Sequence, residues 1–219
     1  MKSEVFHPET NGHPPPTADV EIFTPEGSIK GLLHKAEGAR GAIIMVGDAS
    51  GGLDGPAGLY EPLAQLLQKA GIMSLRIDYR EPNDLRESIY DVLAGVEAVR
   101  QQGAERVVLL GWAFGGAVVI TAGVASDLVV GVATIACQNL GAEMAPELSP
   151  KSLLIIHGTD DMETPDRYSR DLYSRAREPK ELVLYAGGDH ELARHSGLAI
   201  DKLRAWSTGL LLISARATG

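Results

Sequence analysis

Apolar residues occur along this chain in short runs that are separated by longer amphipathic stretches. The runs are rich in Val, Ile and Leu without polar alternation, which is typical of parallel strands covered on both faces. They occupy residues 41–46, 72–77, 106–110, 128–136, 152–156 and 181–185. The stretches between them have helical spacing, over residues 59–69, 84–102, 114–125, 165–178 and 191–212. This alternation predicts an α/β fold with a doubly wound, mostly parallel sheet.

The N-terminal part of the chain has a different pattern. Residues 1–17 are polar and include three consecutive prolines, so we expect a flexible segment that buries little surface. From Ala18 onward apolar and polar residues alternate, and Pro25-Glu26-Gly27 supplies a turn. This pattern predicts an antiparallel hairpin at the edge of the sheet. We therefore expect one domain over residues 18–219.

The connection over residues 137–150 is too short to hold a domain of its own. It follows a predicted strand, at a place where many folds of this kind insert a helical cap. We therefore predict that no cap domain is present and that any site at this edge of the sheet is open.

The segment Gly111-Trp112-Ala113-Phe114-Gly115-Gly116 lies between a predicted strand and a predicted helix. Its spacing is that of a nucleophile elbow, with Ala113 at the central position. The tight turn requires residues without side chains two positions before and two positions after the central residue, and the following helix directs backbone N–H groups toward a developing oxyanion. Tight packing or a phosphate cradle is the alternative, although the glycine spacing is not that of a dinucleotide site.

Two later loops carry an acid and a histidine. The strand at 152–156 ends in His157-Gly158-Thr159-Asp160-Asp161, and the strand at 181–185 is followed by Gly187-Gly188-Asp189-His190. Elbow, acid and histidine come in the order that α/β-hydrolases use. Taken singly, Asp161 could be a helix N-cap and His190 a loop histidine, but together they favour a catalytic set. His157, His34 on the edge hairpin and His195 on the final helix are assigned no catalytic role.

On these motifs the chain resembles the α/β-hydrolase superfamily, particularly its small dienelactone-hydrolase-like and serine-esterase members. The resemblance extends from Ala18 to the C-terminus. It implies that Asp161, rather than Asp160, is the acid that orients the base His190. It also implies that position 113 is the nucleophile position.

The segment 48–56, Asp-Ala-Ser-Gly-Gly-Leu-Asp-Gly-Pro, looks like the oxyanion loop of this superfamily. Asp48-Ala49 stand in place of the usual His-Gly, and the match implies that the backbones of Ser50 and Phe114 donate to the oxyanion. A register one or two residues earlier stays open, as does a plain glycine-rich surface loop.

Ala113 has no oxygen, so an acyl-enzyme cannot form on its side chain. The chain is either a deliberately inactivated serine hydrolase, a natural non-catalytic protein that binds a ligand or partner in the open pocket, or an enzyme that uses another group. Candidates for that group are Cys137, Ser50 and a water activated by the His190–Asp161 pair. The otherwise complete set of residues favours the first alternative. We predict that the parental enzyme, with a nucleophile at position 113, hydrolyses carboxylic esters. The protein with Ala113 is expected to have almost none of this activity.

Composition narrows the possible partners. The formal net charge of −9 argues against nucleic acid and anionic membrane surfaces. A single cysteine excludes an internal disulfide and fits a reducing compartment, and the sequence shows no signal-peptide core or membrane span. His, Cys and carboxylate residues do not show metal-site spacing. We therefore expect a cytoplasmic protein with a small ester-like substrate and without metal or organic cofactor.

Overall fold

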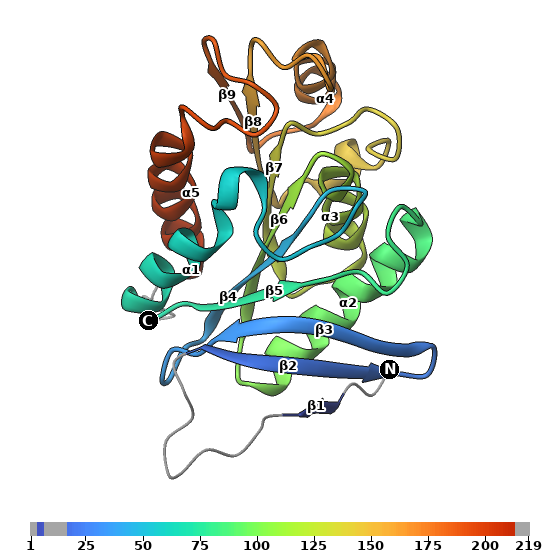
Figure 1. The fold of residues 1–219 in the computed structure, drawn as a ribbon, viewed down its shortest axis with the longest axis vertical. Helices are drawn as coiled ribbons and strands as arrows, with labels where there is room; N and C mark the ends of the chain where they lie inside the picture. Colours follow the sequence, from blue (N-terminus) through green and yellow to red (C-terminus); the bar gives the residue numbers. More distant parts are fainter. Residues whose placement is uncertain (1–3, 7–16, 213–219) are drawn as a thin grey trace.

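A central β-sheet organises the molecule. The computed structural model describes residues 4–6 and 17–212, in which nine strands pair in the order β1-β2-β3-β5-β4-β6-β7-β8-β9 (Figure 1). The strands are β1 (Glu4–Phe6), β2 (Thr17–Thr24), β3 (Gly27–His34), β4 (Gly41–Val46), β5 (Met73–Ile77), β6 (Arg106–Trp112), β7 (Val129–Ile135), β8 (Ser152–Gly158) and β9 (Lys180–Tyr185). Strands β4 to β9 are parallel, as the unbroken apolar runs predicted.

The N-terminal strands are antiparallel. β2 and β3 form the predicted hairpin, and β3 continues the sheet by pairing with β5. Residues 4–6 differ from the expectation for the 1–17 segment, because they form strand β1 against β2, and Thr17 already belongs to β2. The rest of that segment, residues 1–3 and 7–16, lies outside the described residues. His34 ends β3, so it lies on this hairpin as expected, and its side chain is buried.

Helices cover both faces of the sheet. In Figure 1, α1 (Tyr60–Lys69) and α5 (Ser196–Leu211) lie on one face, and α2 (Leu85–Gln101), α3 (Phe114–Ala125) and α4 (Arg167–Arg175) lie on the other. Two apolar cores correspond to these two layers. Asp84 caps α2 by accepting a hydrogen bond from the Glu87 amide. α5 begins later than predicted, because Leu192 has a left-handed φ of 56° that a helix does not accommodate. None of the described helices combines the length and apolar character needed to cross a bilayer.

The order of the strands makes β4 the topological switch point of the sheet. The chain leaves β4 through α1 to reach β5 on one side, then returns through α2 to reach β6 on the other side of β4. The loops that follow β4 and β6 therefore diverge at the carboxyl ends of these strands, where open α/β sheets bind their ligands. The elbow follows β6 and the predicted oxyanion loop follows β4.

Between β7 and β8 the chain forms only loops and the short 3-10 helix η2 (Ala145–Leu148). This agrees with the predicted lack of a cap at this connection. A second 3-10 helix, η1 (Pro56–Gly58), lies between β4 and α1.

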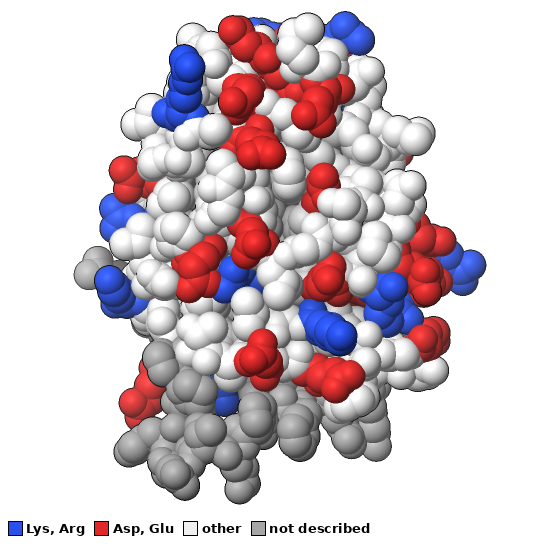
Figure 2. Space-filling view, in the orientation of Figure 1, with Lys and Arg blue, Asp and Glu red and all other residues white. Residues whose placement is uncertain are grey.

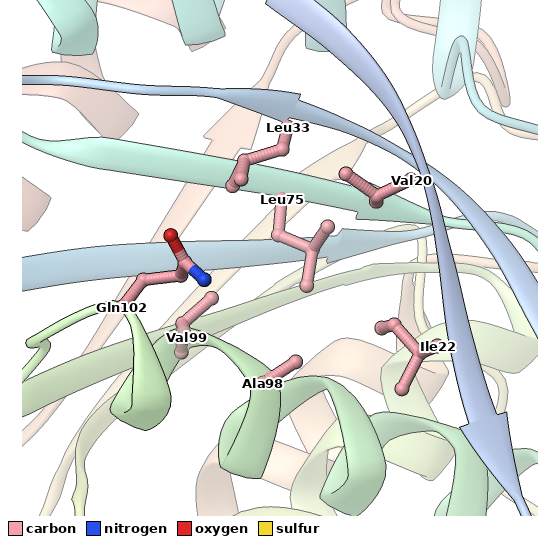
Figure 3. Close-up of a pocket in the computed structure, with 7 residues that line it drawn as sticks. All are labelled: Val20, Ile22, Leu33, Leu75, Ala98, Val99 and Gln102. Carbon is pink, nitrogen blue, oxygen red and sulfur yellow. The ribbon is translucent and has the colours of Figure 1, made fainter. Parts of the chain in front are cut away.

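A small apolar void lies between the N-terminal strands and the end of α2 (Figure 3). Its volume is about 10 Å³, which is no more than the space of a single water molecule. The void is lined by Val20, Ile22, Leu33, Leu75, Ala98, Val99 and Gln102. It is a packing defect that is too small to bind an organic substrate.

Candidate active site

Ala113 occupies a strained turn between β6 and α3. Its φ is 50° and its ψ is −110°, and it stands at the N-cap of α3. Positive φ at a residue with a side chain costs about 1–3 kcal/mol, and such strain concentrates at functional sites. The Ala113 amide donates to Ile135 O at 2.9 Å, which fixes the turn to β7. The side chain at position 113 is thus held at the carboxyl edge of the sheet, at the start of a helix.

Two glycines make this turn possible. A Cβ on Gly111 would lie 2.1 Å from the Gly115 carbonyl oxygen, and a Cβ on Gly115 would lie 2.2 Å from the Gly47 carbonyl oxygen. Both contacts are with backbone, which cannot move aside without opening the turn. The spacing read from the sequence therefore has a steric cause, and the second contact places the loop after β4 directly against the elbow.

The predicted acid and base lie together. The His190 Nδ1–H donates to Asp161 Oδ2 at 2.8 Å, although the two residues belong to loops after different strands. The Asp161 side chain is fully buried, whereas the His190 side chain is 11% exposed. Because Nδ1 faces the carboxylate, Nε2 on the opposite side of the ring is left for proton transfer. Asp160, the alternative acid, is exposed and accepts from Thr159 Oγ1.

Asp161 is held by hydrogen bonds to both carboxylate oxygens. Oδ1 accepts from the backbone amides of Glu163 at 2.9 Å and Thr164 at 2.8 Å. Oδ2 lies 3.1 Å from His157 Nε2 in addition to its bond with His190. His157 thus contacts the site, although its sequence context predicts no catalytic role for it. The signal that could have found it is its spacing of four residues before the acid, at the end of the same strand.

The base lies beside the elbow. The ring of His190 packs against the indole of Trp112, with centroids 5.4 Å apart and an interplanar angle of 41°. Trp112 precedes Ala113, so the histidine ring stands next to the residue that flanks the nucleophile position. His195, expected on the final helix, stands at the N-cap position just before α5, and its ring stacks on that of Tyr185 with centroids 5.4 Å apart.

Two buried tyrosines fix the end of β4 where the predicted oxyanion loop begins. The Tyr60 hydroxyl donates to Val46 O at 2.7 Å, and the Tyr79 hydroxyl donates to Gly47 O at 3.2 Å. Burial raises the pKa of both phenols above their ordinary range, so both stay protonated as donors.

The two predicted oxyanion donors differ in their availability. Phe114 is the first residue of α3, where a backbone amide has no partner within the helix. The Ser50 amide instead donates to Asp48 Oδ1 at 2.9 Å, and the Ser50 hydroxyl donates to the same oxygen at 2.6 Å. In this arrangement the Ser50 amide is already engaged. Ala49, one residue earlier, has no hydrogen bond on its amide within the described part of the chain.

Cys137 is poorly suited to act as a nucleophile. Its thiol is buried against Gly116, and burial raises its pKa to about 12, so the thiolate is scarce at neutral pH. Among the described residues, His, Cys, Asp and Glu side chains do not gather in threes in a way that could hold a metal ion.

An open pocket adjoins the elbow. The Gln138 amide donates to Ala113 O at 3.4 Å, and the loop that starts there forms one wall of a pocket of about 580 Å³. The pocket is lined by Gln138, Asn139, Leu140, Glu143, Tyr168 and Arg175. Leu140, in the wall of this pocket, is 78% exposed, and Met162, which follows the acid in the chain, is 91% exposed; these two side chains form the rim of the site. The pocket wall starts beside the backbone of position 113, whereas Ala113, Asp161 and His190 are not among the residues that line it.

Replacing Gly158 with alanine is expected to destabilise the protein strongly. Gly158 ends β8, and a Cβ there would lie 2.2 Å from the Gly188 carbonyl oxygen in the loop that carries His190. Forcing these two backbones apart should cost about 3 kcal/mol or more, a fall in Tm of about 6–12 °C. Thermal unfolding followed by circular dichroism measures the effect.

Gly197 supplies the matched control. It lies in α5 and a Cβ there would contact nothing within 4 Å, so Gly197→Ala should leave Tm unchanged or raise it slightly. Equal Tm values for the two variants would show that the contact between the acid loop and the base loop is not tight.

No protein-family model matches this chain. Among curated proteins, it is 31% identical over 126 residues to YfhR of Escherichia coli K12, described as uncharacterized. That alignment covers 46% of this chain and 44% of the relative, so it spans less than half the length of YfhR. The YfhR protein of Salmonella typhi is 24% identical over 235 residues, covering 84% of this chain and 79% of the relative.

Several solved structures share the fold of this chain over most of its length, although their sequence identity to it is low. The esterase domain of a Rhodothermus marinus protein has a TM-score of 0.74 at 16% identity, covering 89% of this chain and 99% of that one. An α/β serine hydrolase homologue from Coxiella burnetii has a TM-score of 0.73 at 18% identity, covering 85% and 95%. A dienelactone hydrolase from Anabaena variabilis has a TM-score of 0.71 at 17% identity, covering 94% and 99%. Together with the strand order and the elbow, these similarities establish that the chain has the α/β-hydrolase fold.

Proposed function

We propose that the chain is a carboxylic ester hydrolase of the serine type in which Ala113 has replaced the nucleophile. The observation that carries the proposal is the His190–Asp161 pair, at 2.8 Å, beside the strained elbow at Ala113. Esterases and hydrolases among the structural neighbours support the same class of reaction. Hydrolysis of thioesters, amides or lactones would use the same groups.

The chemistry follows from the positions of these groups. With serine at 113, His190 Nε2 would take the hydroxyl proton as Oγ attacks the ester carbonyl carbon. The negative charge that develops on the carbonyl oxygen would be met by the Phe114 amide at the start of α3 and by an amide of the loop after β4. His190 would then protonate the leaving alcohol and activate a water that releases the acid. Asp161 would hold the His190 tautomer and stabilise its charged form throughout.

A fluorophosphonate probe tests this proposal without a chosen substrate. The probe phosphonylates an activated serine, so Ala113→Ser is expected to gain one adduct per chain, detected by intact mass. The unaltered chain should gain none, and Ala113→Ser combined with His190→Ala should react far more slowly. If the Ala113→Ser protein is folded but is not labelled by the probe, the proposal is contradicted. That result would favour a protein that binds a ligand without catalysis.

The charge around the pair indicates which esters would bind. The two loops that hold Asp161 and His190 also carry four exposed acidic side chains, Asp160, Glu163, Asp189 and Glu191, against one exposed basic side chain, Arg194. Figure 2 shows acidic side chains gathered at the top of the drawn face, where β8 and β9 lie in Figure 1. This charge should repel esters that bear a carboxylate, so we infer that the substrates are neutral or cationic.

A matched pair of substrates measures this preference. In Ala113→Ser, kcat/KM for p-nitrophenyl hexanoate should exceed that for mono-p-nitrophenyl adipate by about 10-fold at low salt, and the gap should narrow in high salt. Glu163→Gln combined with Glu191→Gln should narrow it too. A gap that does not respond to salt or to these substitutions would show that pocket shape, and not charge, sets the preference.

A further inference from the structure

Asp161 is in contact with two histidines. His157 lies at the end of β8 with its side chain fully buried, and its Nε2 is 3.1 Å from the same Oδ2 that accepts from His190. His157 is also linked to two other groups. Nε2 lies 2.6 Å from the Thr164 carbonyl oxygen, and Nδ1 lies 2.6 Å from Ser169 Oγ. Ser169 is a buried residue of α4.

These partners fix the protonation of His157. A carbonyl oxygen can only accept, so Nε2 must carry the proton and share it between Thr164 O and Asp161 Oδ2. Nδ1 is then an acceptor, and Ser169 donates its hydroxyl proton to it. Burial lowers the pKa of His157, although Asp161 and Asp166 act in the opposite direction, so the ring stays neutral and in this one tautomer.

The consequence concerns the orientation of the acid. Two backbone amides hold Oδ1, and the His157 Nε2–H reaches Oδ2 from a direction that His190 does not use. If His157 were absent, Oδ2 would keep only His190 among its described side-chain partners, and the carboxylate could follow that ring as it moves. With His157 in place, Oδ2 stays at one position, and His190 must keep Nδ1 directed to it.

We propose that His157 and Ser169 are positioning residues that hold the Asp161 carboxylate, and through it the tautomer of His190. Neither touches the reacting atoms. The inference rests on the proposed function for its catalytic meaning, but the orientation of His190 can be measured in the chain as it stands.

The test is ¹⁵N NMR of the imidazole nitrogens, which reports the nitrogen that carries the proton. It is done on the Ala113 protein at alkaline pH, where a free imidazole is neutral. In the unaltered chain His190 should be protonated on Nδ1 alone. In His157→Leu it should become a mixture of both tautomers, and in His157→Gln, whose side-chain amide can donate from nearly the same place, it should stay close to the unaltered form.

Ser169→Ala keeps the inference testable should His157→Leu not fold. It removes only the hydroxyl behind the ring, and a smaller shift toward the mixture is expected. Ser207→Ala is the matched control, because Ser207 is also buried and its hydroxyl has no hydrogen-bond partner among the described residues. The inference is overturned if the His190 tautomer is unchanged in a folded His157→Leu variant. If that variant does not fold, an unchanged His190 tautomer in Ser169→Ala overturns it.

Kinetics in the Ala113→Ser background give a second readout. His157→Leu should lower kcat by about 10- to 100-fold with little change in KM, and His157→Gln should recover most of the loss. Equal losses in the two variants would mean that packing, and not the donated hydrogen bond, is what matters. If Ala113→Ser is itself inert, the proposed function fails while the NMR result still decides the role of His157.

Discussion

Ala113→Ser is expected to raise the hydrolysis of p-nitrophenyl acetate and butyrate by about 10⁴-fold or more over the unaltered chain. The hydroxyl would be added to a turn whose backbone, base and acid already stand in the geometry of an active site. Serine is larger than alanine by only one oxygen atom, so the substitution changes the volume at this position little. Initial rates at a common substrate concentration measure the gain.

The control for this gain is the same protein without its base. Ala113→Ser combined with His190→Ala should return the rate to within about 10-fold of the unaltered chain, because serine alone is a weak nucleophile at neutral pH. A rate that rises equally with and without His190 would mean that position 113 works independently of the pair. A folded Ala113→Ser protein with no added activity would leave a binding protein as the remaining interpretation.

Asp161→Asn in the Ala113→Ser protein is expected to lower kcat by about 10⁴-fold. The amides of Glu163 and Thr164 require an acceptor at the Oδ1 position, so the new side chain must turn its NH₂ group toward the two histidines. A donor facing His190 Nδ1 forces the ring into the other tautomer, with its proton on Nε2. That nitrogen can then no longer accept the serine proton.

Asp160→Asn provides the matched comparison, since the two residues are adjacent and carry the same charge. Asp160 is exposed and does not contact His190, so kcat should stay within about 2-fold. Comparable losses in the two variants would show that the negative charge of the loop matters more than the orientation of one carboxylate. Circular dichroism should confirm that both variants fold.

The sequence predicted those parts of the site that depend on local geometry. The glycines at 111 and 115 are required by backbone contacts within one turn, so their spacing alone identified the elbow. Asp161 and His190 follow strands that are neighbours in both sequence and space, and the pair could therefore be predicted from their order. The helix and strand periods of the buried elements were visible for the same reason, because each repeats within a few residues.

Other features depend on contacts that no local pattern records. The position of β4 between β5 and β6 arises from crossovers on opposite faces, which the apolar runs do not specify. The sequence does not reveal the contact of His157 with Asp161, because this contact depends on how the loop folds back on β8. The engagement of the Ser50 amide by Asp48 is a further example, since Asp48 departs from the usual loop residue and forms its own turn.

The floor and the rim of this site are built from different kinds of contact. The floor consists of backbone pressed on backbone, at Gly111, Gly115 and Gly158, where any side chain would collide. The rim is made of Leu140 and Met162, which lie mostly in solvent and support little of the fold. Substitutions at the rim should therefore accumulate at small cost in folding free energy. A scaffold of this kind can change the molecules it accepts over evolutionary time, or under a designer's selection, while the backbone around position 113 stays fixed.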